Sequence, residues 1–207
     1  LNITLIITTI MTGDDDDPIL QLKLSVASGT TRSHAVRIPP KSDLVPALVQ
    51  AANIAMEHSA GDDKSAFVMT AVGSLSSVTL RMAASDNDNN KDDSQSNKRQ
   101  KTTPTSTSTN DAAKSSLAEQ TSLEIQTFDQ HFEIVSLVGT FSSDGGKHLH
   151  MSVSDAKGHV IGGHLVAGTI FTTLELVLGT IDGVSFAREM DAHTGYNELL
   201  VQQKTST

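Results

Sequence analysis

The sequence predicts an α+β fold in which an antiparallel sheet packs with few helices, within a single domain. Many short segments alternate apolar and polar residues, as half-buried strands do, whereas only one segment repeats apolar residues at helical spacing. The connections between strand segments are mostly too short for the crossover helices that parallel neighbours require. These two observations favour antiparallel pairing around one hydrophobic core.

Composition limits the chemistry of the chain. Among its 207 residues there is no cysteine, so disulfides and thiolate metal sites are excluded. Any metal ion must therefore be held by His, Asp or Glu. The formal net charge of -9 argues against broad electrostatic binding to nucleic acid, which needs a surplus of Lys and Arg.

We expect residues 1–31 to be disordered, a domain over residues 32–202 and a short tail over 203–207. Ten residues precede Met11, which we expect to be the natural start. They are apolar but run into four aspartates, and they fall far short of the roughly 20 residues needed to span a bilayer. The sequence thus predicts a location in the nucleus or cytoplasm, without secretion or membrane insertion.

Residues 84–121 form the clearest break in composition, because Leu117 is their only large apolar side chain. Such a segment cannot bury enough surface to offset its ordering entropy, so we predict a disordered insertion within the domain. Lys98, Arg99 and Lys101 lie in it and match the short basic pattern of a nuclear import signal. Ordinary solvated charge is the alternative interpretation.

The first strand is expected at residues 33–38, and Pro39-Pro40 ends it. Ser42 is expected to cap a helix over residues 43–60, whose first turn tolerates Pro46. The helix carries one apolar stripe, which consists of Leu44, Leu48, Ala51, Ala52, Ala55 and Met56.

Short strands are expected on both sides of the insertion. Before it, residues 66–72 and 76–83 are two strands that a tight turn at Gly73-Ser74 connects. After it, the strands cover residues 122–128, 131–141, 169–179 and 184–190, together with a histidine-rich hairpin.

The hairpin reads KHLHMSVSDAKGHVIGGHL over residues 147–165. Its turn is Asp155 to Gly158, where Asp suits the first position of a type I turn and Gly suits the left-handed residue after it. A slip of one residue would scatter the apolar residues over both faces of the sheet, so one register is favoured. Its pairs are Asp155 with His159, Val153 with Ile161, His150 with His164 and Leu149 with Leu165.

This register places His148, His150 and His164 on one face and leaves His159 at the turn. Three histidines without a fourth protein ligand are typical of an open site for zinc or another divalent transition metal. Two other interpretations stay open: a solvated polar face beside nearby serines, or a surface that contacts another subunit. No catalytic residue is predicted, since no nucleophile elbow accompanies those serines.

Three further polar residues lie in the predicted strands. His34 is interpreted as a polar residue at a strand end whose side chain has a hydrogen-bond partner. Arg81 either pairs with a carboxylate or forms part of a site. Glu175 is expected to be a partly buried carboxylate or a partner that orients a histidine.

Together these segments resemble the PPC family (plant and prokaryote conserved domain). The matching stretches, in family order, are HAVRIPPKSDL (34–44), AVGSLSSVTLR (71–81), FEIVSLVGTF (132–141), HLHMSVSDAKGHVIGGHL (148–165) and MDAHTGYNELLV (190–201). The resemblance implies an α+β domain with an antiparallel sheet that assembles as a homotrimer. The histidine signature is similar to the prokaryotic branch, some of whose members look able to hold a metal.

Plant members of the family are AT-hook nuclear proteins that regulate transcription. The Arg-Gly-Arg-Pro core of the hook is missing here, so the resemblance does not imply direct binding to AT-rich DNA. Phe132, Glu133 and Ile134 keep the centre of a stretch that those proteins use to contact other regulators.

The sequence therefore favours a non-enzymatic, trimeric protein with a regulatory or DNA-associated role through contacts with other proteins. The alternative is a metal-binding module or metal-dependent enzyme centred on the three histidines.

Overall fold

The computed structural model describes residues 25–59, 64–83, 124–192 and 194–204. These residues form one helix and eight strands. In chain order they are β1 (Thr31–Ile38), α1 (Leu44–Glu57), β2 (Ser65–Arg81), β3 (Ile125–Phe128), β4 (Phe132–Ser142), β5 (Lys147–Ser154), β6 (Val160–Ile181), β7 (Val184–Met190) and β8 (Asn197–Gln203).

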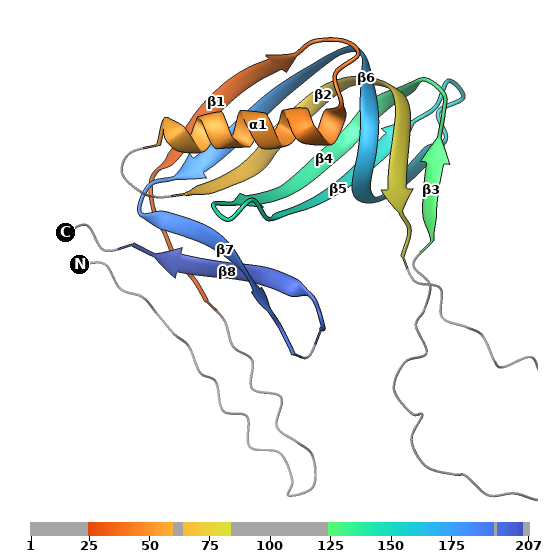
Figure 1. The fold of residues 1–207 in the computed structure, drawn as a ribbon. Coiled ribbons are helices and arrows are strands. Elements are labelled where there is room, and N and C mark those ends of the chain that lie inside the picture. The colour runs from red at the N-terminus through yellow and green to blue at the C-terminus, as the bar shows by residue number, and fades with distance from the viewer. Residues whose placement is uncertain (1–24, 60–63, 84–123, 193, 205–207) are drawn as a thin grey trace, which may run out of the picture.

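The main sheet has the order β1-β6-β5-β4-β2-β3, and its paired strands are antiparallel. Because β2 also pairs with β6, the strands β2, β4, β5 and β6 close into a ring (Figure 1). β7 and β8 form a separate two-stranded ribbon (Figure 1). Its strand β7 contacts β4 and β2 of the main sheet. The predicted α+β class with an antiparallel sheet is confirmed.

The helix α1 lies against β6 and β2 and buries one face (Figure 1). Its buried residues are the six of the predicted apolar stripe: Leu44, Leu48, Ala51, Ala52, Ala55 and Met56. They pack into a single core with the inward-facing residues of the strands. The prediction that Ser42 caps the helix is wrong. Asp43 is the N-cap residue, and the Ser42 hydroxyl donates instead to the carbonyl of Pro39 at 3.0 Å.

The predicted tight turn at Gly73-Ser74 is wrong. Residues 65–81 form one strand that passes through Gly73-Ser74. A Cβ on Gly73 would lie 2.2 Å from the carbonyl oxygen of Thr173, so this glycine allows β2 and β6 to approach closely where their register shifts. Likewise the second hairpin strand and the predicted strand 169–179 merge into the continuous β6.

Several predictions concern parts of the chain outside the described residues. They include the insertion over 84–121 with Lys98, Arg99 and Lys101, and the expected start at Met11. Within the described part of the chain, α1 is the only helix, and it is neither long nor apolar enough to cross a membrane.

Candidate metal site on the outer face of the sheet

The turn between β5 and β6 has the predicted form. The Asp155 amide donates to the carbonyl of His159 at 3.0 Å, and Gly158 has a φ of +82°. The Asp155 carboxylate accepts hydrogen bonds from the backbone N–H groups of His159 and Lys157, at 2.9 and 2.8 Å, and these bonds lower its pKa. His159 contacts this carboxylate at 3.1 Å through its ring and takes no part in the histidine cluster.

The predicted register of the hairpin is confirmed where it decides the site. His150 pairs with His164, and Val153 pairs with Ile161. The predicted pair of Leu149 with Leu165 is wrong, because β6 leaves β5 after His164 and continues along β2, where Leu165 faces Leu80. Leu149 and Leu165 are nonetheless both buried in the core.

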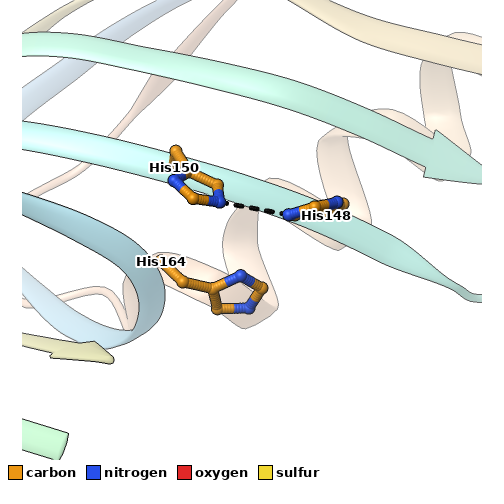
Figure 2. Close-up of side chains that lie close together, drawn as sticks. All are labelled: His148, His150 and His164. Atoms are coloured by element: carbon orange, nitrogen blue, oxygen red, sulfur yellow. Dashed lines mark hydrogen bonds between the residues drawn. The ribbon is translucent and has the colours of Figure 1, made fainter. Parts of the chain in front are cut away.

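The three rings converge on the outer face of the sheet (Figure 2). Nε2 of His148 and Nε2 of His150 are 3.1 Å apart, and ring centroids are separated by 5.0–5.4 Å. One ligand atom from each ring lies within 4.8 Å of the other two. Two nitrogens bound to a tetrahedral zinc ion at about 2.0–2.1 Å lie roughly 3.3 Å apart. The His148–His150 pair already has this spacing.

The surroundings keep two of the imidazoles neutral, which is the form that binds metal. Burial lowers the pKa of His164 to about 4, with a further contribution from the charge of Arg81. Partial desolvation also lowers the pKa of His148, and the charges of His150 and Arg188 lower it further, whereas the charge of Glu198 raises it. Protons therefore compete weakly with a metal ion at neutral pH.

One atom in the cluster has an unmet bonding requirement. Nδ1 of His164 is buried and has no hydrogen-bond partner within the described part of the chain. Buried polar atoms in proteins are seldom left without a partner, and each exception calls for an explanation. A lone pair directed at a metal ion would supply one, so the residues present fit a divalent transition metal held by three imidazoles.

A shallow hollow of about 250 Å³ lies next to the cluster. His150 lines it, together with Ser136 and Val138 from β4 and Ser152 from β5. Gly162 opens the hollow further because it has no side chain. A small ligand can thus reach the cluster from solvent along the sheet.

The other predicted polar residues have separate outcomes. Nε2 of His34 bonds to the Thr180 hydroxyl at 3.1 Å, as expected for a satisfied polar residue. The prediction for Glu175 is wrong, because this residue is exposed and pairs with Arg37, far along β6 from His164. Arg81 lies directly opposite His164 and thus beside the site.

The structure places the predicted protein-contact residues in two environments. Phe132 and Ile134 are buried in the core, with 3% and 7% of their surface exposed. Glu133 is exposed. Only Glu133 is therefore available on the surface of a single chain.

Sequence reasoning missed Arg188. It comes from β7, yet its Nη2 donates to the hydroxyl of Thr140 at 2.8 Å, and Thr140 lies directly opposite His148. No local pattern could have indicated this contact, because it depends on where the β7–β8 ribbon lies against β4.

The known protein families give a clear match. A family model described as the Plants and Prokaryotes Conserved (PCC) domain matches residues 25–182. The chain belongs to this family. The match covers α1 and the whole main sheet, including all three histidines of the cluster.

A curated relative, the bifunctional protein GlmU of Synechococcus sp. (strain JA-3-3Ab), is 33% identical over 177 residues. That match covers 85% of this chain and 21% of the relative, so the chain spans about a fifth of the length of that protein.

Three solved structures have the same fold. A hypothetical protein from Salmonella enterica has a TM-score of 0.61 and 26% identity, with 86% of this chain and 98% of that chain covered. A metal-containing protein from Archaeoglobus fulgidus has a TM-score of 0.58 and 18% identity, with coverage of 86% and 99%. A Bacteroides thetaiotaomicron protein, whose name assigns DNA binding provisionally, has a TM-score of 0.55 and 16% identity, with coverage of 83% and 96%.

Proposed function

We propose that this Plants and Prokaryotes Conserved domain is a metal-binding module. It would hold one divalent transition-metal ion, with zinc as the simplest case, through His148, His150 and His164. The observation that carries the proposal is the convergence of three ring nitrogens from two strands within 4.8 Å. The composition supports it, since a chain without cysteine must use imidazole or carboxylate ligands for a transition metal.

Two physical features favour metal binding over a solvated polar face. The hairpin and the core beneath it hold the rings in position, because Leu149, Met151 and Val153 alternate with the histidines and are buried. The lowered pKa of His164 also leaves that ring neutral and ready to bind. A metal ion held here by three protein ligands would keep an open position, where it can polarise a ligand or lower the pKa of bound water. The name of the Archaeoglobus fulgidus neighbour is consistent with a metal in this fold.

The test is elemental analysis of protein purified without an affinity tag, incubated with zinc and then freed of excess metal. We expect about one zinc ion per chain in the wild type. His148→Ala, His150→Ala and His164→Ala should each lose most of it. His159→Ala is the matched control, because this histidine is bound to Asp155 at the turn. Metal in the wild type that all three cluster variants retain would contradict the proposal, as would its absence from the wild type.

A second role, regulation through contacts with other proteins in a homotrimer, is supported by a different surface. A groove of about 480 Å³ runs over β1, β2 and β6 and presents Ala35, Val72 and Val177. Arg37 and Glu175 lie directly opposite one another in it. Apolar groups on an exposed sheet face are a natural contact for a second copy of the chain.

Analytical ultracentrifugation tests this second role. The proposal expects a trimer that Val72→Glu dissociates, and a monomeric wild type would contradict it. Direct binding to DNA is expected to be weak even at low salt, because the chain carries a formal net charge of -9. Tight binding of an AT-rich duplex would contradict that expectation.

A further inference from the structure

Two arginines flank the histidine cluster, one on each side. Arg81 on β2 lies directly opposite His164 in the sheet. Arg188 on β7 reaches Thr140, which is the direct partner of His148 on β4. Side chains directly opposite each other in a ladder share one face and have Cβ atoms about 4.5–5.5 Å apart. The Arg188 guanidinium therefore contacts a side chain that neighbours His148, and the Arg81 side chain begins directly beside His164.

Neither guanidinium group has a carboxylate partner within 4.0 Å among the residues that the structure describes. This separates them from Arg32, whose guanidinium binds Asp182 at 3.0 Å. Nε of Arg188 is also buried without a hydrogen-bond partner in the described residues. A buried donor on a charged group is costly to leave unsatisfied, so an anion beside the Arg188 guanidinium would offset part of this cost.

The chain holds Arg188 in this position through three separate features. Its backbone N–H donates to the Asp144 carboxylate at 2.9 Å, and its Nη2 donates to Thr140 at 2.8 Å. Gly146 leaves room for its stem, since a Cβ there would lie 2.5 Å from the Arg188 Cγ. The guanidinium is thus placed before any ligand arrives, which lowers the entropic cost of binding.

The charges around the cluster favour an anion. Arg188, Arg81 and Lys147 lie close enough to lower the pKa of one or both of His148 and His164. Glu198 acts in the opposite direction on His148. A divalent ion on the three imidazoles would add two positive charges to this surface. The hollow beside His150, at about 250 Å³, is smaller than the pockets that hold drug-sized ligands, so the anion must be small.

We propose that the three-histidine site, once loaded with its metal, binds a small oxyanion whose carboxylate or phosphate group pairs with Arg188 and Arg81. The hollow beside His150 receives the remainder of the ligand. This inference rests on the proposed metal-binding function and gives that function a ligand class. Planar guanidinium groups suit both anions, since their N–H donors can bind two oxygens at once.

The test uses protein loaded with cobalt(II), because the visible absorption of this ion reports the ligands around it. Sodium acetate and inorganic phosphate are titrated separately, and isothermal titration calorimetry provides a second measure of binding. In the wild type, at least one anion should change the spectrum and bind in a saturable manner. The anion that binds more tightly identifies the ligand as a carboxylate or a phosphate.

Arg188→Gln and Arg81→Gln should keep their cobalt and weaken anion binding about tenfold or more, since each removes charged hydrogen bonds. Arg32→Gln is the matched control, because this arginine lies on β1 opposite Thr180 and its guanidinium pairs with Asp182, away from the cluster. Gly146→Ala should weaken binding while keeping the charge of Arg188, which covers the case in which Arg188→Gln folds poorly.

Failure of this inference differs from failure of the metal site. Cobalt that binds without any response to either anion would overturn the oxyanion proposal and leave the metal site standing. Equal anion affinity in the wild type and both arginine variants would do the same. If no cobalt binds, both proposals fail together.

Discussion

The two faces of the β5–β6 hairpin differ in what holds their side chains in place. On the inner face, Leu149, Met151 and Val153 are at most 3% exposed and pack into the core. On the outer face, His148 and His150 are exposed, so burial of their side chains contributes little to the stability of the fold. The same backbone therefore carries a stabilising face and a face whose side chains contribute mainly to binding. The two faces should respond to substitution in opposite ways.

The largest expected effect is on the inner face. Leu149→Ala should lower the free energy of unfolding by about 2–5 kcal/mol, because it removes buried methyl groups and leaves a cavity. His148→Ala on the outer face should change it by no more than about 0.5 kcal/mol in metal-free protein. Urea denaturation in the presence of EDTA measures both. Similar losses for the two variants would show that the histidine face is structural.

Bound zinc should make the histidines of the outer face contribute to the stability of the fold. Zinc at about one hundred times its dissociation constant is expected to stabilise the wild type by about 2.7 kcal/mol, since it binds only the folded chain. His164→Ala should lose this gain and keep its metal-free stability. Thermal unfolding with and without zinc measures the difference. An equal zinc-dependent rise in Tm for the variant would place the ion elsewhere.

A change on the neighbouring strand should affect both faces at once. A Cβ on Gly139 would lie 2.0 Å from the carbonyl oxygen of His148, so Gly139→Ala must displace β5. We expect a loss of about 1–3 kcal/mol in stability, together with weaker zinc binding. Val138→Ala, at the adjacent exposed position, is the control for stability. If Gly139→Ala binds zinc as the wild type does, the position of β5 does not determine the site.

The smallest effect is a pH dependence of the metal-free protein. The pKa of His164 is about 4 in the folded chain, mainly because of burial, against about 6.5 in an unfolded chain. Between these values the unfolded chain binds a proton that the folded chain does not, so stability should fall as the pH decreases from about 6.5 to 4. His164→Gln should reduce this decline. Urea denaturation at several pH values measures this decline in both proteins. If stability falls equally in the wild type and in His164→Gln, the decline does not come from His164.

The features that the sequence predicted best are local ones. The turn from Asp155 to Gly158 determines the hairpin register, and the register brings His150 opposite His164. The apolar stripe of α1 follows directly from its spacing. In each case neighbours in sequence carry the information.

The features that it missed depend on contacts between distant segments. Gly73 resembles a turn residue, yet it serves the close approach of β2 to β6. Glu175 alternates with apolar neighbours as a buried carboxylate would, but its face of β6 is open to solvent. Arg188 reaches the site only because the β7–β8 ribbon lies against β4. The closure of β2, β4, β5 and β6 into a ring and the position of the β7–β8 ribbon are tertiary properties. No short sequence pattern indicates them.

The X-ray absorption spectrum of the zinc-loaded protein shows most directly whether the outer face holds a metal ion through three imidazoles. We expect three imidazole nitrogens at about 2.0–2.1 Å and one further light ligand in a four-coordinate site. That imidazole signal should weaken in His150→Ala and persist in His159→Ala. A spectrum without imidazole scattering, such as that of zinc held by carboxylates and water, would contradict metal binding by the three histidines.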